Sequence, residues 1–368
     1  MSKHEPLTVL TIDAGGTNFV FSAISDFKKV GEAITLPANA DNLDRCLSTI
    51  VTGFEQLTQQ VTHFDAISFA FPGPADYHQG IIGDLPNFKA FKGGVPLGLI
   101  LRRHFGVPVY INNDGNLFAS GEALAGYLPE LNGRLKKAGS SKQFKNLVGI
   151  TLGTGFGCGI VVNGNLLVGD NSSGAEIHNT LNPTHPDWNA EESVSTRAIQ
   201  RVYAEMSNQN FDSSLMPKHI YDIAKGKILG NIKAANIAFI QYGTALGASI
   251  CNVLSLIDGI VVIGGGLTGS WDLFAQPMFQ EINKQLENFH HQKANRLSFQ
   301  VFNLEDQSTF EKFAKGETIE LQIPGTDENI RYDTIPRTGI GLSKLGGSLA
   351  TSLGAYAFAV QQLSNDKQ

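Results

Sequence analysis

The chain has 368 residues, which is too many for one ordinary hydrophobic core and suits two domains. Hydrophobic residues make up 42% of the chain and charged residues 17%, as in water-soluble globular proteins. The formal net charge of −6 provides no basic field for nucleic acid, so an anionic substrate must be held by backbone N–H groups, helix N-termini or a metal ion.

Membrane and disulfide-rich proteins are also disfavoured. No run of about 18 apolar residues is present, and the N-terminus lacks a stretch typical of a signal peptide, so we expect no membrane partner. The three cysteines, Cys46, Cys158 and Cys251, are far apart and form no Cys-x-x-Cys pair. We therefore expect no disulfide framework, and the reduced cytoplasm is the predicted location.

Apolar runs alternate with amphipathic stretches along the chain, which is typical of an α/β fold. Residues 7–12 and 18–24 are predicted strands, joined by the glycine turn Asp13-Ala-Gly-Gly-Thr17. Apolar residues at helical spacing follow at 41–60. Residues 66–71 then form a short apolar run that predicts a buried strand.

That strand ends in Pro72-Gly-Pro74. Another predicted strand, 107–111, ends in Asn112-Asn-Asp114 and leads into a helix near 117–127. The polar, lysine-rich stretch 133–145 is predicted to be a solvated loop.

The pattern then restarts. Residues 147–152 and 159–162 are predicted strands around a second glycine turn, Gly153-Thr-Gly-Phe-Gly157. A long helix is predicted at 234–256, and the strand at 260–263 runs into three glycines.

A last apolar helix, 348–361, closes the chain. A strand, a glycine turn with a threonine and a second strand thus occur twice, at 7–24 and at 147–162. We interpret this repetition as two similar domains, each presenting a phosphate-binding hairpin to a shared cleft. The predicted first domain is 1–118 plus 352–368, and the second is 119–351.

The first glycine turn is suited to phosphate. Glycines let the backbone approach phosphate oxygens closely and expose N–H donors, and the hydroxyl of Thr17 can add another donor. Asp13, at the end of a strand, can hold Mg²⁺ directly or through water. The alternative is a plain hairpin turn that Asp13 caps.

The other glycine clusters carry similar alternatives. Four glycines lie within residues 153–159, and a purely structural turn needs fewer because each costs conformational entropy. Gly264-Gly-Gly266 follows a strand, where the chain can pass flat against a nucleoside ring. A tight strand-to-helix turn is the alternative there.

Asp114 is the catalytic candidate, because it ends a strand and opens a helix, where α/β sheets place their ligands. Transfer of a phosphoryl group to a sugar needs one carboxylate that accepts the hydroxyl proton. A helix N-cap is the alternative role of Asp114. The candidates for binding sugar hydroxyls are Asn87, Asn113, Glu176, His178, Asn179, Glu191 and Glu192.

The order of these motifs resembles that of the ROK family of sugar kinases and repressors. The matching motifs are Asp13-x-Gly-Gly-Thr17, Pro72-Gly-Pro74, Pro86-Asn87, Asn113-Asp114-x-Asn116, Leu152-Gly-Thr-Gly155, Gly264-Gly-Gly266 and Leu353-Gly-Ala355. The resemblance extends from about residue 8 to 358. It implies an actin-like ATPase (ribonuclease H-like) fold, with two domains flanking a cleft for sugar and ATP.

The resemblance also implies roles at matching positions. Asp114 would be the general base, and Asn113 and Asn87 would bind sugar hydroxyls. The residues implied around ATP and Mg²⁺ are Asp13, Gly15, Gly16, Thr17, Asn18, Gly153, Thr154, Gly155, Gly265 and Gly266. Asp13 would hold the metal, and a homodimer or homotetramer is implied.

The chain departs from the family pattern near its second phosphate turn. Many members carry a cysteine-rich zinc site there, whereas residues 174–192 contain no cysteine. Two histidines, His178 and His185, cannot alone build the four-ligand site that structural zinc requires, so we predict no structural zinc.

The sugar-binding positions differ as well. The family's Glu-x-Gly-His becomes Glu176-Ile-His178-Asn179, one residue tighter, so either His178 or Asn179 takes the place of the family's histidine. The later family glutamate, four residues before a serine, matches Glu191, and Glu192 is the neighbour that a one-residue shift selects.

The C-terminal region, 296–345, is longer than is usual in the family. Residues 318–323 and 329–334 are predicted strands on either side of a turn, which indicates a hairpin insertion around 316–335. Packing or a dimer contact is its predicted role, and a lid over the nucleotide is the alternative.

These features predict ATP-dependent phosphorylation of a hexose. Glucose is the first choice because both sugar-binding glutamate positions are filled. An N-acetylhexosamine, mannose or fructose is the alternative substrate, and an inactive kinase or a non-catalytic sugar-binding regulator is the alternative class. ROK repressors carry a helix-turn-helix domain before the first glycine motif, and we expect none before Asp13.

Overall fold

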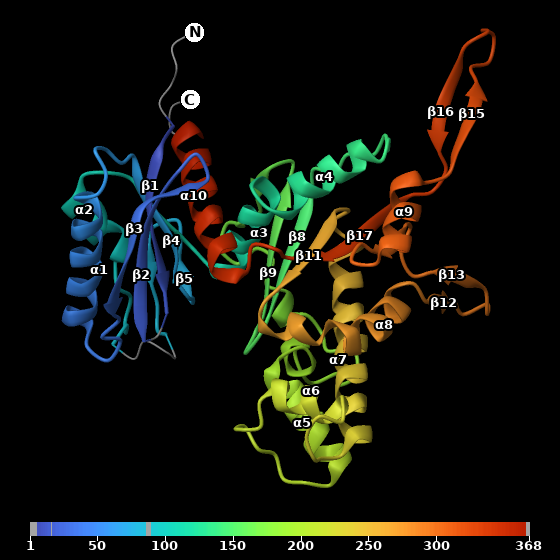
Figure 1. Cartoon of the computed structure of the whole chain (residues 1–368), viewed down its shortest axis with the longest axis horizontal. Coiled ribbons are helices and arrows are strands. Elements are labelled where there is room, and N and C mark those ends of the chain that lie inside the picture. Colours follow the sequence, from blue (N-terminus) through green and yellow to red (C-terminus); the bar gives the residue numbers. More distant parts are fainter. Residues whose placement is uncertain (1–5, 16, 86–89, 366–368) are drawn as a thin grey trace. The chain divides into compact units, whose positions relative to one another are not determined.

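The computed structural model describes residues 6–15, 17–85 and 90–365. Its residues form two compact units (Figure 1). The first unit comprises Met1–Gly126, Gly159–Ala175 and Lys344–Gln368, and the second comprises Tyr127–Cys158 and Glu176–Ser343. The predicted domains, 1–118 plus 352–368 and 119–351, have different boundaries, and that division stays a prediction.

The first unit is built on a five-stranded sheet in the order β3-β2-β1-β4-β7. Its strands are β1 (Thr8–Ala14), β2 (Asn18–Ser25), β3 (Lys28–Pro37), β4 (Ala66–Ala70) and β7 (Val109–Asn112). β1, β4 and β7 are parallel, whereas β1, β2 and β3 pair antiparallel. Because parallel strands end at one edge of a sheet, the residues that follow β1 and β7 lie at the same edge. A short pair, β5 (Ala75–Asp76) with β6 (Ile81–Ile82), follows β4.

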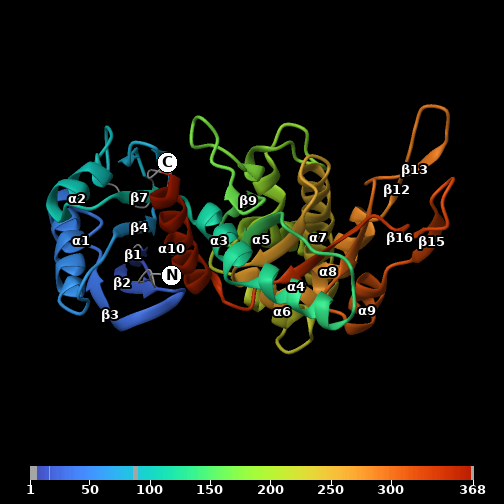
Figure 2. The same cartoon turned by 90° about the horizontal axis from the view of Figure 1, so that it is seen from above.

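Helices cover both faces of this sheet (Figure 2). α1 (Leu43–Thr58) and α2 (Leu97–Phe105) lie over one face, where the aromatic core includes Phe21 and Phe54. α10 (Gly347–Asn365) packs on the other face, against Val9 and other alternate residues of the strands.

The helix that follows β7, α3 (Asp114–Leu124), packs tightly on α10 at two glycines. A Cβ atom on Gly121 would overlap the carbonyl oxygen of Ala350, and one on Gly354 would overlap that of Leu117. The Leu353-Gly-Ala355 motif therefore has a packing reason, because only glycine allows the two backbones to approach this closely.

The second sheet has the strand order β10-β9-β8-β11-β17-β14. Its strands are β8 (Leu147–Leu152), β9 (Phe156–Val162), β10 (Asn165–Leu166), β11 (Ile260–Gly264), β14 (Gln300–Asn303) and β17 (Arg337–Leu342). From Gly159 onward, β9 and β10 group with the first unit. β8 and β11 are parallel neighbours, with Gly264 opposite Thr151, so the turns that follow these two strands lie at one edge of the sheet.

Six α-helices are described in the second unit. They are α4 (Tyr127–Lys137), α5 (Thr196–Ser207), α6 (Pro217–Ala224), α7 (Ile232–Leu254), α8 (Trp271–Ile282) and α9 (Gln307–Lys315). Three of them, α5, α6 and α8, pack on the long helix α7. Among the described residues, α7 alone is long and apolar enough to cross a membrane, and 67% of its most apolar window is buried inside the structure. A Cβ atom on Gly247 of α7 would lie 2.6 Å from the Met278 carbonyl oxygen, so α7 and α8 are in close contact.

Two hairpins extend from the second unit (Figure 1). They are β12 (Gln285–Glu287) with β13 (Lys293–Asn295), and β15 (Thr318–Gln322) with β16 (Asn329–Asp333). The second occupies the segment where the sequence predicts a hairpin insertion. Its base is held by the buried Arg337, whose Nη1 lies 2.5 Å from Oδ2 of Asp333.

The predicted loop at 133–145 is partly wrong, because α4 continues to Lys137. Leu128, Leu131 and Leu135 recur at helical spacing and are buried, while Lys136 and Lys137 of the same helix are exposed. Only the residues after Lys137 form the irregular connection to β8.

Candidate active site

The first glycine turn joins β1 to β2 in the first unit. The side chain of Asp13 is exposed and has no hydrogen bond or ion pair within the described part of the chain. Thr17 and Asn18 are exposed beside it. A Cβ atom on Gly15 would lie 2.9 Å from the Asn18 carbonyl oxygen, so a larger residue would distort the turn. Gly16 lies outside the described residues.

Asp114 is the first residue of α3, directly after β7. The N-cap of this helix is Asn113, whose Oδ1 accepts a hydrogen bond from the Asn116 N–H at 2.6 Å. Asp114 is exposed, and its Oδ1 accepts the adjoining Gly115 N–H at 2.9 Å. The capping role considered for Asp114 thus belongs to Asn113, and the Asp114 carboxylate remains accessible. Asn87 lies outside the described residues.

Two fully buried asparagines support the start of α3. Asn112 Oδ1 accepts hydrogen bonds from the Asn113 N–H and from Nδ2 of Asn116, both at 2.9 Å. Within the described residues, Asn112 Nδ2 and Asn116 Oδ1 are buried without a partner. Leaving such groups unpaired costs about 1–3 kcal/mol each, a cost that proteins tolerate mainly at functional sites. The role of Asn112 was not predicted, because an asparagine at the end of a strand gives no local signal of its buried contact with Asn116.

The second glycine turn follows β8 in the second unit. The Gly153 N–H donates to the Gly155 carbonyl at 3.1 Å, which closes the turn, and the side chain of Thr154 is exposed at its tip. The Phe156 N–H donates to Oε2 of Glu191 at 2.9 Å. A Cβ atom on Gly155 would lie 2.9 Å from the same oxygen, so this glycine makes room for the glutamate.

A second connection reaches this turn from the start of α5. The Gly153 carbonyl accepts two hydrogen bonds from Thr196, from its N–H at 2.9 Å and from its Oγ1 at 3.0 Å. The sequence analysis did not single out Thr196, and a lone threonine after a serine gave no signal for this contact.

The two neighbouring glutamates differ in their surroundings. Glu191 and Glu192 lie in the 3₁₀ turn η2 (Ala190–Ser193) and both contact Arg197. Arg197 forms a two-pronged contact with Glu192, at 2.6 and 3.0 Å, and this hydrogen bonding lowers the pKa of the Glu192 carboxyl. Glu191 receives one hydrogen bond from Arg197, from Nη2 at 2.8 Å, and another from the Phe156 N–H of the glycine turn.

Glu176 and His178 form a pair, with Nδ1 2.9 Å from Oε2. The hydrogen bond that His178 donates to Glu176 raises the pKa of His178, and the negative charges of Glu176 and Glu191 act in the same direction. Asn179 ends the 3₁₀ turn η1 (Ile177–Asn179) and is exposed. Of the two candidates for the histidine position, His178 is therefore the one that lies near the carboxylates.

The glycines after β11 precede the 3₁₀ turn η3 (Gly266–Ser270). Gly265 has a φ of 96°, and a Cβ atom there would overlap the backbone of Leu152. This glycine is therefore required by both its conformation and its packing on β8. A Cβ atom on Gly266 would meet nothing within 4 Å, so open space adjoins it.

The cysteine-free segment is organised by a buried asparagine. Asn182 Nδ2 donates to the Asn189 carbonyl at 2.9 Å and to Ser193 Oγ at 2.8 Å. Its Oδ1 accepts the N–H groups of Thr184 and His185 at 3.0 and 3.1 Å. These four bonds hold together the loop that leads to Glu191.

His178 and His185 do not face a common metal. His178 pairs with Glu176, whereas the ring of His185 stacks on Trp188 with centroids 4.1 Å apart. Across the described residues, no group of three or more His, Cys, Asp or Glu side chains is placed to hold a metal ion.

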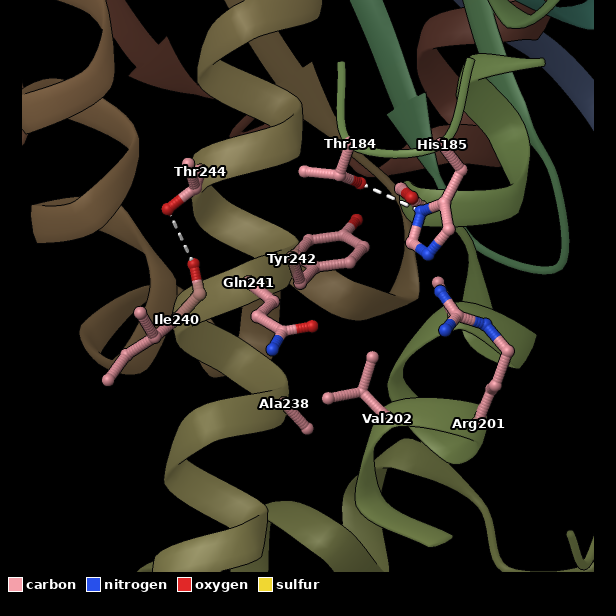
Figure 3. A pocket seen from close by; sticks show the side chains of 11 residues that line it. Thr184, His185, Arg201, Val202, Ala238, Ile240, Gln241, Tyr242 and Thr244 are labelled. Carbon is pink, nitrogen blue, oxygen red and sulfur yellow. Dashed lines mark hydrogen bonds between the residues drawn. The ribbon is translucent and has the colours of Figure 1, made fainter. Parts of the chain in front are cut away.

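A separate pocket of about 110 Å³ lies between α5, α7 and residues 184–185 (Figure 3). Tyr242 is 2% exposed, and its hydroxyl, directed toward Thr184 and His185, has no partner among the described residues. Arg201 lines the opposite side and binds Glu205 at 3.1 Å. No predicted site residue lines this pocket.

Two groups of predicted residues thus come together, each within one unit. In the first unit, the Asp13 turn and Asp114 follow the parallel strands β1 and β7 at one sheet edge. In the second unit, the Gly153 turn and Gly265 follow the neighbouring strands β8 and β11. Glycine turns and carboxylates at the carboxyl ends of strands are suited to binding phosphates and a polar substrate.

Comparisons with known proteins show the family to which the chain belongs. A model of the ROK family matches residues 9–309. The structure of a glucokinase from Parabacteroides distasonis is 46% identical, covers 98% of this chain and 99% of its own, and superposes with a TM-score of 0.87. The curated glucokinase of Thermotoga maritima is 27% identical over 75% of this chain and 87% of its own length.

A more distant structure shares the fold. A ROK glucokinase from Streptomyces griseus, in complex with glucose and AMPPNP, is 17% identical over 95% of this chain and 98% of its own, with a TM-score of 0.57. These matches confirm the predicted α/β, actin-like fold class. Because the family model spans most of the chain, this protein belongs to the ROK family, as a glucokinase-like sugar kinase.

Proposed function

We propose that this protein transfers the γ-phosphoryl group of ATP to the 6-hydroxyl of glucose, with Asp114 as the general base. The observation that carries the proposal is the Asp114 carboxylate, which is exposed at the start of α3 and relieved of the capping role by Asn113. The glucokinase relatives support glucose as the acceptor.

Asp114 would accept the proton of the sugar 6-hydroxyl while the oxygen of that hydroxyl bonds to the γ-phosphorus. The bond between that phosphorus and the β,γ-bridging oxygen breaks, and ADP leaves. A positioned base of this kind contributes about 10²–10⁴-fold to the rate. Asn113 would hold the sugar through its side-chain amide, as we also propose for Asn87.

The second unit would supply the remaining sugar contacts. Glu176, His178 and Glu191 gather two carboxylates and an imidazole, which together can accept and donate hydrogen bonds to adjacent hydroxyls. We place Glu191 rather than Glu192 in this role because Glu191 contacts the glycine turn and acts on His178, whereas Glu192 is held by Arg197 in a two-pronged contact. Asn179 is the second choice for the histidine position.

Each glycine turn is proposed to contact phosphate oxygens. The Thr17 and Thr154 hydroxyls are exposed at these turns, and Gly15, Gly16, Asn18, Gly153 and Gly155 would line the phosphates. Gly265 and Gly266 would adjoin the adenosine, where open space next to Gly266 admits a ring.

The residues present fit a magnesium ion. The exposed carboxylate of Asp13 is a hard oxygen ligand, and Mg²⁺ is commonly bound by one or two carboxylates together with substrate phosphates. When bound, Mg²⁺ neutralises charge on the phosphate oxygens. Asp13 would hold it directly or through water.

The proposal is tested by replacing Asp114 with asparagine, which keeps the shape of the side chain but cannot accept the proton. We expect kcat/KM for glucose to fall by about 10²–10⁴-fold in a coupled ADP assay, with thermal unfolding little changed. Asp44→Asn is the matched control, because Asp44 also lies in the first turn of a helix, α1, and is exposed.

Equal turnover by wild type and Asp114→Asn would show that Asp114 is not the base. The same assay with N-acetylglucosamine, N-acetylmannosamine, mannose and fructose tests the acceptor. If kcat/KM is higher for one of these sugars than for glucose, that sugar is the proposed substrate in place of glucose, and the kinase proposal stands.

A further inference from the structure

The second glycine turn is bound to the segment that carries the sugar-site glutamates. Three hydrogen bonds make this connection, namely two from Thr196 to the Gly153 carbonyl and one from the Phe156 N–H to Glu191. Their lengths are 2.9, 3.0 and 2.9 Å. Glu191 and Thr196 lie on either side of the bend from η2 into α5, so one short segment holds both ends of the turn.

Glu191 divides its two oxygens between different neighbours. Oε2 accepts from the Phe156 N–H, and Oε1 accepts from Arg197 at 2.8 Å. Gly155 leaves the space that this arrangement needs, because a Cβ atom there would lie 2.9 Å from Oε2. The position of the carboxylate and the conformation of the turn are therefore mutually dependent.

We propose that Thr196 and Glu191 couple the sugar site to the phosphate-binding turn, with Thr196 as a positioning residue that acts through Gly153. This inference rests on the proposed function, because it takes Glu191 as a sugar ligand and residues 153–157 as a phosphate ligand. A sugar that fixes Glu191 then also fixes the turn, so sugar and nucleotide each strengthen binding of the other by the same factor.

The physical reason is the entropy of the turn. A glycine-rich segment loses more conformational freedom than any other when it is ordered around phosphate. The hydrogen bonds from Thr196 and to Glu191 restrict the turn before the nucleotide binds, so less conformational entropy is lost on binding. A sugar that stabilises these hydrogen bonds lowers the remaining entropy loss further. A turn held only by its own bond, from the Gly153 N–H to the Gly155 carbonyl, would order independently of the sugar.

The test begins with hydrogen–deuterium exchange of the ligand-free protein. Thr196→Val keeps the shape and the backbone N–H but removes the hydroxyl bond, and Thr196→Ser restores the hydroxyl. We expect amides of residues 153–157 to exchange about fivefold faster in Thr196→Val than in wild type, with Thr196→Ser near wild type, because one hydrogen bond contributes about 1 kcal/mol.

Thr244→Val is the matched control. Thr244 also donates its hydroxyl to a backbone carbonyl, that of Ile240 at 2.9 Å, but this bond lies within α7 and involves no residue of the turn. This variant should leave exchange at 153–157 unchanged. Unchanged exchange in Thr196→Val as well would overturn the positioning role, whether or not the protein is a kinase.

Calorimetric titration then measures the coupling. AMPPNP with Mg²⁺ is titrated into wild type and Thr196→Val, each with and without saturating glucose. We expect glucose to tighten AMPPNP binding by about fivefold or more in wild type and by less than twofold in Thr196→Val, within the usual range of couplings between sites. Equal enhancement in both proteins would overturn the inference. Wild-type turnover, measured separately, reports on the proposed function.

Discussion

The two glycine turns share a local pattern, but the surrounding structure holds them differently. In the first unit, Asp13 is exposed in the turn after β1. The described backbone hydrogen bonds of this turn are made within its own hairpin and with Ala38, which directly follows β3. In the second unit, the turn after β8 is held from outside by Thr196 and Glu191. The first turn presents a charge, whereas the second presents backbone tied to the candidate sugar site.

This difference indicates that the two similar turns have different functions. A free carboxylate on a lightly held turn can adjust to a metal ion and its waters. A turn tethered by several hydrogen bonds can instead respond to what binds its tethers. Substitutions in the first turn should therefore change metal dependence, and substitutions in the second should change the response to sugar.

The largest effect in this comparison is expected for Asp13→Asn. The amide keeps the size of the side chain but removes the negative charge that would hold Mg²⁺. We expect kcat/KM to fall on the order of 10²-fold, with a rise in the Mg²⁺ concentration for half-maximal rate, since a metal contributes several kcal/mol of charge stabilisation. Steady-state assays over a range of Mg²⁺ concentrations measure both effects.

Asp44→Asn serves again as the control for loss of one surface carboxylate, and it should leave the Mg²⁺ dependence unchanged. If Asp13→Asn lowers turnover without shifting the Mg²⁺ requirement, Asp13 does not act through the metal. The proposal that the first turn binds the metal, unlike the second turn, would then be wrong.

A smaller effect is expected for Gly155→Ala in the second turn. The new Cβ atom would lie 2.9 Å from Oε2 of Glu191, so the carboxylate must shift and its bond to the Phe156 N–H is weakened. We expect kcat/KM for the sugar to fall by about tenfold, the value of one hydrogen bond to a charged group.

Gly153→Ala is the matched variant, because a Cβ atom there would meet nothing within 4 Å. Because Gly153 is also proposed to line the phosphates, some loss of kcat/KM is expected, but it should be smaller than that of Gly155→Ala, since no carboxylate has to move. Similar losses in both variants would mean that the turn needs glycine for its backbone conformation and that the contact with Glu191 has no special effect.

Much of the fold could be predicted from the sequence because the buried strands are short apolar runs bounded by glycine or polar turns. The hairpin around the first turn and the long helix α7 are examples. The sequence did not predict α4, because the polar lysines and Gly133 made the helical spacing of the leucines at 128, 131 and 135 hard to recognise. Local composition suggested a loop there, whereas burial of the leucines within the second unit favours a helix.

Candidate site residues could be predicted only where the residue type and its place at a strand end together indicate a function. Asp13, Asp114 and the glycine turns stand at strand ends that the hydrophobic pattern reveals. Thr196 acts through a residue 43 positions earlier, Asn112 through buried amides, and Arg197 through glutamates five and six positions earlier. The hydrophobic pattern of the sequence reports none of these pairings. The choice of Asn113 as the helix cap likewise depends on backbone geometry at a single residue.

The smallest expected effect concerns the pH dependence of the second unit, through His178. The hydrogen bond to Glu176 raises the pKa of folded His178 above the ordinary value of 6.5. The folded protein therefore binds more protons than the unfolded chain between these two values. The stability that the pair contributes is fully present below pH 6.5 and is lost as the pH rises through the folded pKa.

Urea unfolding at a series of pH values measures this contribution. The free energy of unfolding of wild type should fall more between pH 6 and 8 than that of Glu176→Gln, in which the charge that stabilises the imidazolium is absent, and His178→Gln should remove this dependence. The first turn has no such histidine, so Asp13→Asn should retain the wild-type slope. A steeper slope in Glu176→Gln than in wild type would mean that His178 is charged by other neighbours, and the Glu176–His178 pair would then not be the pH-sensitive part of the sugar site.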